Sequence, residues 1–455
     1  MDYNALRVLI DRESIDFLDL KVIDLYGNLR HLTLPVSFLN EKVLEEGVGF
    51  DASSYGLSSV GASDLVLIPD TATFFRDPFR GAPVLSCFTN IHCTDKGRSP
   101  FLEDPRYIAR KAEVLLQKKI RRATSFWGPE YEFYLFRDFY LEEDQLSLQV
   151  KISPLERIEK GAYHAELPTE KLVQFRDEAC QILQKLRISV KYHHHEGGGL
   201  GQHEIETCFE PLLKTCDDAM LIRYVLKNLA SRENLSLTFM PKPIYGAPGN
   251  GWHVHCFLKD EERNLFYDEK GTYSHLSQIA LNFMGGILKH ARSLCAFTNP
   301  STNSYKRLVP GFEAPTSITF GRGNRSSACR IPTYVSGAEE TRFEYRPPDS
   351  TGNPYLCLSA ILLAGLDGVE KQIDPVKEGL GPFEEDLFSS EKAEKLSFLP
   401  ASLDEALDAL EKDSEFLTKD GVMSKPLIEK WIKFKREEAR EISLRVHPFE
   451  LKRYF

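Results

Sequence analysis

The chain has 455 residues, of which 42% are hydrophobic and 27% charged, and its formal net charge is −10. This length is too great for one compact core and predicts two or more domains. The acidic balance, without a basic run, argues against a nucleic-acid partner. The apolar stretches are too short or too interrupted to span a bilayer, so no membrane partner is expected.

The N-terminal residues and the cysteines indicate the cellular compartment. The first sixteen residues carry early acids and no apolar run, so we do not expect a signal peptide. Nine cysteines are spread along the chain without a C-x-x-C pair. This pattern favours free thiols in a reducing environment, and we therefore expect a cytoplasmic protein.

The sequence pattern changes near residue 100. Residues 1–100 consist of short β-branched segments separated by turns, and Tyr26-Gly27-Asn28 is typical of a hairpin turn. An amphipathic helix is then predicted over 104–118, with a proline in its first turn. We expect a strand-rich N-terminal domain over 1–100 and a second domain over 101–455.

Beyond residue 120 the hydrophobic spacing alternates between helical and strand periods. Helices are expected at 169–187, 217–231, 274–296, 354–373, 403–412 and 425–444. Strands are expected at 126–136, 188–193, 237–241, 251–260 and 341–346. This mixture predicts an α+β domain that carries its polar motifs on a sheet.

Three short motifs place two polar residues two positions apart in apolar or aromatic surroundings. They are Glu130-x-Glu132, His253-x-His255 and Glu344-x-Arg346. On a strand, residues i and i+2 point to the same face, so each motif delivers two polar groups to one surface. An edge strand with one wet face would also explain the first motif, and a lone histidine pair is more often structural. Together the three motifs indicate one polar site.

A glycine-rich segment at 192–206 adds four histidines, three of them consecutive at 193–195, and the carboxylates of Glu196 and Glu204. Glycines permit sharp turns and close approach to a ligand. Converging carboxylates repel one another unless cations lie between them. A carboxylate majority favours Mg²⁺ or Mn²⁺ over zinc. We therefore predict a divalent-metal site, although His193 and His194 fit ordinary packing equally well.

The segment GRGNRSSACRIP carries Arg322, Arg325 and Arg330. Guanidinium forks suit phosphates and carboxylates, but a solvated loop would accept three arginines as well. The sequence contains no GxxxxGK[ST] motif, so a nucleotide would not be held by a P-loop. It contains no GxSxG motif for a nucleophile either.

The ordered motifs of the chain resemble those of type I glutamine synthetases. They are FDASS, GPEYEF, HHHE with GQHE, FMPKP with GWHVH, NSYKRLVPGFEAP, NRSSACRIP and EYRPPDSTGNPYLCL. The resemblance implies an α+β fold with an N-terminal β-grasp domain. It also implies a catalytic domain whose curved antiparallel sheet forms half of an intersubunit funnel. The family assembles as a dodecamer of two hexameric rings, in which the N-terminal domain of one subunit closes the funnel of the next.

The resemblance implies a reaction and its ligands: ATP-dependent ligation of ammonia to L-glutamate through γ-glutamyl phosphate, with two or three Mg²⁺ or Mn²⁺ ions per site. One metal would be held by Glu132, Glu196 and Glu204, and a second by Glu130, His253 and Glu344. The ATP contacts match Phe209, His255, Arg325, Arg330 and Arg342. The glutamate contacts match Glu132, Gly249, His253, Arg307, Glu313 and Arg346.

The ammonium pocket of the family matches Asp51, Ser54, Tyr163, Glu196 and Glu313. Three residues have catalytic roles by this resemblance. Asp51 would be the base that deprotonates ammonium, Glu313 would lie on a flap that closes over the intermediate, and Arg325 would face the transferred phosphate.

Several positions depart from the residues that are usual in the family. Ala247 and Pro248 stand where relatives carry an aspartate and an asparagine, of which the asparagine helps to seat glutamate, and Phe257 replaces a serine. Lys191 replaces a glutamate and Glu339 a lysine, and these reversals would compensate one another if they lie close together. Two alternatives therefore stay open: a γ-glutamyl ligase for an organic amine, and a non-catalytic relative. The complete set of metal ligands favours glutamine synthesis.

Overall fold

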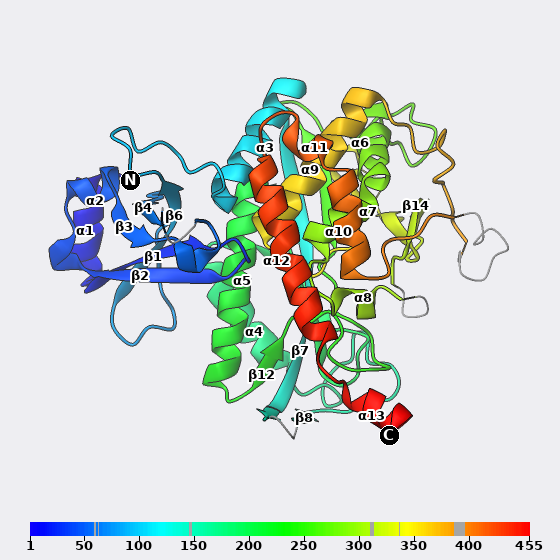
Figure 1. Cartoon of the computed structure of the whole chain (residues 1–455), viewed down its shortest axis with the longest axis horizontal. Coiled ribbons are helices and arrows are strands. Elements are labelled where there is room, and N and C mark those ends of the chain that lie inside the picture. The colour runs from blue at the N-terminus through cyan, green and yellow to red at the C-terminus, as the bar shows by residue number, and fades with distance from the viewer. Residues whose placement is uncertain (59–60, 62, 145–147, 310–313, 336, 386–395) are drawn as a thin grey trace.

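The computed structural model describes residues 1–58, 61, 63–144, 148–309, 314–335, 337–385 and 396–455. Its helices are α1 (Tyr3–Glu13), α2 (Glu41–Glu45), α3 (Pro105–Lys119), α4 (Val173–Lys185), α5 (Leu212–Arg232), α6 (Gln278–Lys289), α7 (Ala291–Thr298), α8 (Ser304–Arg307), α9 (Pro354–Lys371), α10 (Leu403–Lys412), α11 (Glu415–Thr418), α12 (Lys425–Ser443) and α13 (Pro448–Tyr454). Figure 1 shows a small N-terminal body beside a larger body of helices and a sheet. Among the described residues, no helix is both long and apolar enough to cross a membrane.

The N-terminal body is built on a six-stranded sheet with the order β2-β1-β6-β4-β3, and β5 pairs with β6. Its strands are β1 (Phe17–Ile23), β2 (Leu29–Pro35), β3 (Val48–Asp51), β4 (Asp64–Pro69), β5 (Phe75–Arg76) and β6 (Val84–His92). The predicted hairpin turn is confirmed between β1 and β2, where Gly27 has a φ of +85° that favours glycine. Helix α1 was not predicted, although Leu6 and Ile10 lie four residues apart and form its buried face.

The larger body contains a ten-stranded sheet with the order β14-β15-β16-β13-β7-β10-β9, and β8, β11 and β12 also pair with β7. Its strands are β7 (Thr124–Glu143), β8 (Leu148–Pro154), β9 (Val190–His195), β10 (Gln202–Thr207), β11 (Glu210–Pro211), β12 (Ser236–Thr238), β13 (Val254–Lys259), β14 (Ser317–Arg322), β15 (Ser327–Ile331) and β16 (Phe343–Tyr345). The five expected strands are present. Strands β8, β10, β11, β14 and β15 were not predicted.

One predicted helix, over 274–296, is divided into two in the structure. Helix α6 ends at Lys289 and α7 begins at Ala291, with His290 between them. The imidazole of His290 lies 3.0 Å from an oxygen of Asp367 and 2.7 Å from one of Asp413, using both ring nitrogens. The sequence period continues across this break, so periodicity alone predicted one helix.

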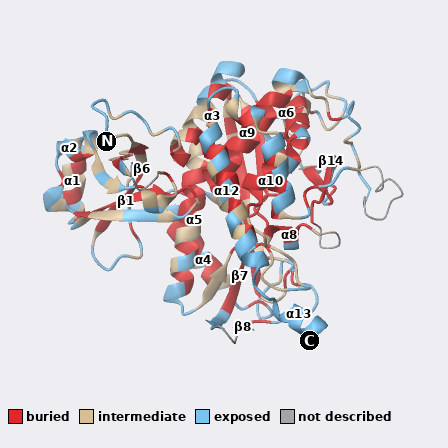
Figure 2. Cartoon of the chain, viewed as in Figure 1, coloured by how far each residue is buried: buried red, intermediate tan, exposed pale blue. Residues whose placement is uncertain are grey.

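The N-terminal body is fastened to helices of its own chain. Arg106 on α3 is buried and donates to Asp217 on α5 at 2.7 Å and to Asp70, just beyond β4, at 3.2 Å. Asn353, the N-cap of α9, donates to the backbone oxygen of Asp24 at 3.2 Å. Figure 2 shows buried residues concentrated along α5, α9 and α10. These contacts attach the N-terminal sheet to the helices of the larger body.

Candidate active site

A cavity of about 950 Å³ collects most of the polar motifs. Of the residues expected to act, it is lined by Glu130, Glu132, Tyr163, Glu196, Glu204, Gly249, His253, Arg307, Arg325, Arg330, Glu344 and Arg346. Glu130 and Glu132 come from β7, Glu204 from β10, Arg330 from β15 and Glu344 from β16, and the others come from α8 and from loops. The first and last of these residues are separated by more than two hundred positions in the chain. The pairing of these strands brings the motifs to one place.

The register of β7 and β10 places carboxylates directly opposite one another. Glu132 pairs with Glu204, and Glu130 pairs with Glu206 two residues further along the ladder. Like charges directly opposite on a sheet destabilise it. The two opposed carboxylate pairs therefore need positive charge nearby.

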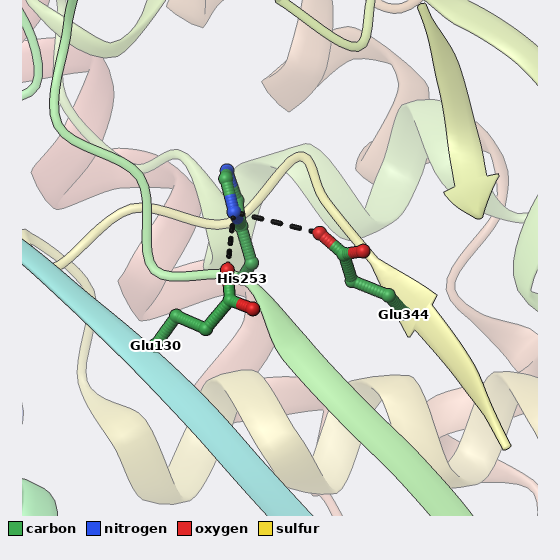
Figure 3. Close-up of side chains that lie close together, drawn as sticks. All are labelled: Glu130, His253 and Glu344. Atoms are coloured by element: carbon green, nitrogen blue, oxygen red, sulfur yellow. Dashed lines mark hydrogen bonds and ion pairs between the residues drawn. The ribbon is translucent and has the colours of Figure 1, made fainter. Parts of the chain in front are cut away.

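The first metal-ligating cluster consists of Glu130, His253 and Glu344, whose ligand atoms lie within 4.8 Å of one another. Figure 3 shows the three side chains converging from β7, from the residue before β13, and from β16. Nδ1 of His253 lies 2.9 Å from Glu130 Oε2 and 3.5 Å from Glu344 Oε1. His253 and Glu344 are buried, and the side chain of Glu130 is 13% exposed. This geometry assembles the three residues that the resemblance assigned to one ion.

Two arginines hold Glu344 in place. Arg330 donates to one carboxylate oxygen at 2.6 Å and Arg346 to the other at 3.0 Å. Burial and the Glu130 charge act to raise the pKa of Glu344, but Arg346 and the neighbouring histidines outweigh them and lower it. In this state Arg330 and Arg346, expected to face phosphate and glutamate, both contact Glu344.

The second metal-ligating cluster consists of His194, Glu196 and Glu204, again within 4.8 Å of one another. The two ring nitrogens of His194 lie 3.6 Å from Glu196 and 3.5 Å from Glu204. Glu132, expected in this set, instead accepts a hydrogen bond from the Gly251 amide at 2.7 Å. Its charge still acts on the cluster, because burial and then Glu132 raise the pKa of Glu196.

The donors of both clusters fit a hard divalent cation. Oε2 of Glu196 is buried and has no hydrogen-bond partner among the described residues. Burial and then the charge of Glu130 raise the pKa of Glu204. A buried, repelling set of carboxylates with one imidazole per cluster is the environment that Mg²⁺ or Mn²⁺ would stabilise.

The opposite side of the cavity is formed by Arg307 and the loop at 247–251. Arg307 is buried and donates to the backbone oxygen of Pro347 at 2.8 Å and to His253 Nε2 at 3.1 Å. A Cβ added at Gly249 would lie 2.8 Å from the Arg307 side chain. The loop therefore approaches the arginine as closely as glycine allows.

Three of the expected nucleotide contacts, Phe209, His255 and Arg342, form a group outside the lining of the cavity. The ring of Phe209 lies 6.4 Å from His255 and 5.1 Å from Phe257, and the Arg342 guanidinium stacks over Phe209 at 5.4 Å. Phe209, His255 and Arg342 are not among the residues that line the cavity itself. Their aromatic and cationic surfaces suit a planar base.

The proposed compensation between Lys191 and Glu339 is wrong. Lys191 forms an ion pair with Glu206 at 2.6 Å, whereas Glu339 forms one with Lys259 at 2.8 Å. Lys191 lies at the start of β9 and Glu339 in the turn before β16. Lys191 and Glu339 therefore each form an ion pair with another residue and not with one another.

Two ammonium-pocket residues lie outside the cavity of their own chain. Asp51 and Ser54 are exposed on the N-terminal body and do not line the cavity. The Ser53 backbone amide donates to Asp51 at 2.9 Å, and this hydrogen bond lowers the pKa of Asp51. Glu313 lies outside the described residues. The chain by itself therefore supplies only part of the expected pocket.

Comparison with known proteins identifies the family. The family model described as "Glutamine synthetase, catalytic domain" matches residues 102–454, and the one described as "Glutamine synthetase, beta-Grasp domain" matches residues 14–94. The chain belongs to the glutamine synthetase family. These matches confirm the predicted fold class, and the enzyme is a ligase of this family.

Relatives of this glutamine synthetase family member extend over its whole length. Glutamine synthetase of Mycolicibacterium smegmatis is 40% identical over 98% of the chain and 97% of its own, and that of Frankia alni is 39% identical over 99% and 98%. A Cupriavidus pinatubonensis protein named 3-hydroxylaminophenol mutase is 39% identical over 98% of both chains. Among solved structures, Plasmodium falciparum glutamine synthetase has a TM-score of 0.90 at 26% identity, covering 100% and 99%. A GmaS/ADP complex has a TM-score of 0.85 at 28% identity, covering 99% of each chain.

The sequence analysis of this glutamine synthetase family member missed one buried residue that ties the site together, Gln202 on β10. Its Nε2 donates to Gly249 O at 2.9 Å, to Asn250 Oδ1 at 3.0 Å and more weakly to Glu132 at 3.4 Å. Its Oε1 accepts from the Gly198 amide at 2.8 Å. Gln202 thus joins the glycine-rich turn, the loop at 247–251 and a carboxylate of the cavity.

Replacing Gln202 by leucine is expected to raise the KM for the amino-acid substrate roughly tenfold or more. Each buried partner left without a hydrogen bond costs about 1–3 kcal/mol, and the loop at 247–251 would lose its fixed position. ATP affinity should change little, because these contacts do not reach Phe209. Steady-state kinetics with each substrate varied in turn would check this. Equal losses in both affinities would show that Gln202 only maintains the fold.

Proposed function

We propose that the enzyme ligates ammonia to L-glutamate with ATP, through γ-glutamyl phosphate, and releases glutamine, ADP and phosphate. One observation carries this proposal. The two carboxylate–histidine clusters lie in the same cavity as Arg307, Arg325, Arg330 and Arg346. Phosphoryl transfer needs charge neutralisation and positioning more than covalent help from the protein.

The two clusters and the arginines have different proposed roles. The first cluster and the second, with Glu132 beside it, would hold Mg²⁺ or Mn²⁺, which would neutralise charge on the transferred phosphoryl group. Arg307 and Arg346 would hold the α-carboxylate of glutamate, since paired guanidinium groups suit a carboxylate. Arg325 and Arg330 would face the phosphates. The γ-carboxylate of glutamate then attacks the γ-phosphate, and ammonia displaces phosphate from the acyl group.

The amine site is proposed to form between subunits. Tyr163 and Glu196 line the cavity of one chain, and burial and then Glu196 raise the pKa of Tyr163. Asp51 and Ser54 of a neighbouring subunit would complete the pocket, together with Glu313. A carboxylate-rich pocket attracts ammonium, and Asp51 would remove its proton.

We further propose that the enzyme assembles as a dodecamer in the cytoplasm. Apolar side chains are exposed on α13, which lies at the edge of the molecule in Figure 2, and on the paired strands β7 and β8. These side chains are Phe139, Leu141, Leu148, Val150, Phe449, Leu451 and Phe455. Exposed apolar patches of this kind favour contacts between subunits.

A second candidate, a γ-glutamyl ligase for an organic amine, is favoured by the loop at 247–251. Pro248 has neither an amide side chain nor an N–H donor. Asn250 does not replace it, since its Nδ2 donates to Met240 O at 2.9 Å and its Oδ1 accepts from Gln202. Chains that are similar to this one carry different names, since they include the GmaS structure and a relative named 3-hydroxylaminophenol mutase.

The acceptor is tested by following ADP release with glutamate plus ammonium, and with glutamate plus a panel of primary amines. The proposal expects the highest kcat/KM with ammonium and glutamine as the product by mass spectrometry. A primary amine that reacts with a higher kcat/KM than ammonium would replace glutamine synthesis by the second candidate.

Restoring the family loop with Ala247→Asp and Pro248→Asn is expected to lower the KM for glutamate by about one to two decades, with little change in kcat. A regained hydrogen bond to the charged amino group contributes roughly 1.5–3 kcal/mol. Asn250 must stay, because it is fully buried and bonded on both sides. Asn250→Ser serves as the contrast and should weaken the loop. An unchanged or higher glutamate KM in the double variant would favour the organic-amine ligase.

A further inference from the structure

Three consecutive histidines end strand β9, and one of them, His194, joins the second metal-ligating cluster. Neighbouring residues of a strand point to opposite faces, so His195 lies behind the face that carries His194. His195 is fully buried and pairs there with Glu156, which is 4% exposed. Neither residue of this pair lines the cavity, and the function proposed above gives neither a role.

Both ring nitrogens of His195 face hydrogen-bond acceptors. Nδ1 lies 2.7 Å from the backbone oxygen of Glu196, and Nε2 lies 3.0 Å from Oε1 of Glu156. A carbonyl and a carboxylate only accept, so both nitrogens carry protons and the Glu156 charge balances the ring. His203 Nε2 lies 3.9 Å from the same Oε1, beyond hydrogen-bonding distance. The pair therefore keeps a donor against the Glu196 carbonyl.

The backbone of His195 also holds the segment that carries Tyr163. The His164 amide donates to the backbone oxygen of His195 at 2.9 Å, and the ring of Tyr163 stacks on that of His164 with centroids 4.0 Å apart. Glu156 lies on the same segment, so His195 contacts this segment at two points. His195 thus contacts Glu196 directly and reaches Tyr163 through its neighbour.

We propose that His195 and Glu156 are a positioning pair that holds Glu196 and Tyr163 in the geometry of the amine pocket. The pair touches no substrate, and it acts through the Glu196 carbonyl and the segment that carries Tyr163. This inference rests on the proposed function, because the amine pocket belongs to it. A displaced pocket would weaken amine binding and spare ATP, since the proposed ATP contacts include none of these four residues.

The test compares two double variants that differ only in the group placed against the Glu196 carbonyl. Both carry Glu156→Gln, so that no buried charge is left without a partner. With His195→Asn the side-chain amide donates in place of Nδ1, whereas His195→Leu offers no donor. The leucine double variant should raise the KM for ammonium about tenfold or more, and the asparagine double variant should stay within about threefold of the wild type.

ATP affinity and Tm separate positioning from a purely structural role. Both double variants should keep the ATP dissociation constant within about twofold of the wild type, which is well below the expected change in KM for ammonium. Glu159→Gln, at an exposed glutamate of the same segment, should keep the wild-type KM for ammonium. Parallel losses of amine binding, ATP affinity and Tm, or equal KM values in the two double variants, would overturn the positioning role.

Binding of Mn²⁺ to the metal-depleted, nucleotide-free assembly needs no reaction. Glu196 belongs to the second metal-ligating cluster, so the leucine double variant should bind Mn²⁺ about tenfold more weakly than the asparagine double variant. That difference in a protein that makes no glutamine would retain the pair and reject the reaction. Its absence in a protein that makes glutamine would reject the pair alone. If both double variants fail to assemble, Glu156→Gln by itself should raise the KM for ammonium at least about threefold, and an unchanged KM would overturn the pair.

Discussion

Replacing Glu130 by alanine is expected to lower ligase turnover by about 10³-fold or more while the assembly stays folded. The Glu130 carboxylate lies 2.9 Å from His253 and 2.9 Å from His255. The substitution therefore removes a metal-ligating carboxylate that contacts both histidines. Metal polarisation supplies several kcal/mol of transition-state stabilisation, and about 1.4 kcal/mol is tenfold in rate. The check is ADP release at saturating Mg²⁺, with assembly followed by light scattering.

The matched control is Glu142→Ala, because Glu142 lies on the same strand β7 but at its exposed end. This variant should keep wild-type turnover. Glu130→Ala also removes one charge from a set of repelling carboxylates, so we expect little loss of folding stability. Turnover of Glu130→Ala within tenfold of the wild type, at saturating Mg²⁺, would remove Glu130 from the metal site.

Replacing Asp51 by alanine is expected to lower glutamine formation by roughly 10²–10⁴-fold, the usual contribution of a general base. ATP affinity should remain close to that of the wild type, because Asp51 is proposed to complete the amine pocket and not the group of Phe209 and Arg342 that suits a planar base. Initial rates at varied ammonium and direct binding of ATP separate these effects. Parallel loss of ATP binding and turnover would make Asp51 structural.

Mixing two inactive variants tests whether Asp51 acts across a subunit boundary. Asp51→Ala and Glu344→Ala should each be inactive alone. In assemblies that contain both at equal amounts, about one quarter of the interfaces would join an intact Asp51 to an intact Glu344 and regain activity. If Asp51 served its own chain, no mixture of the two variants would recover turnover.

The sequence by itself determined many of the helices and strands, and the polar faces of the strands that carry the motifs. The i, i+2 motifs at Glu130, His253 and Glu344 follow the two-residue period of a strand, and the structure brings these three residues into one cluster. Helix α10 was predicted with its observed bounds, because Ser402 caps it and its apolar residues repeat at the helical period. These are local features, and local periodicity is sufficient to encode them.

Only the tertiary structure decided which polar residues meet. His194 joins Glu196 and Glu204, and Glu206 lies opposite Glu130, because β9, β10 and β7 pair in one particular register. Strand period does not specify which strands become neighbours or how a side chain turns, and the hydrogen bond from the Gly251 amide to Glu132 follows from that long-range arrangement. Long-range pairing likewise separated Lys191 from Glu339 and gave each its own partner. Local geometry determines on which face of a strand each side chain lies, whereas contacts across a sheet depend on the packing of the whole chain.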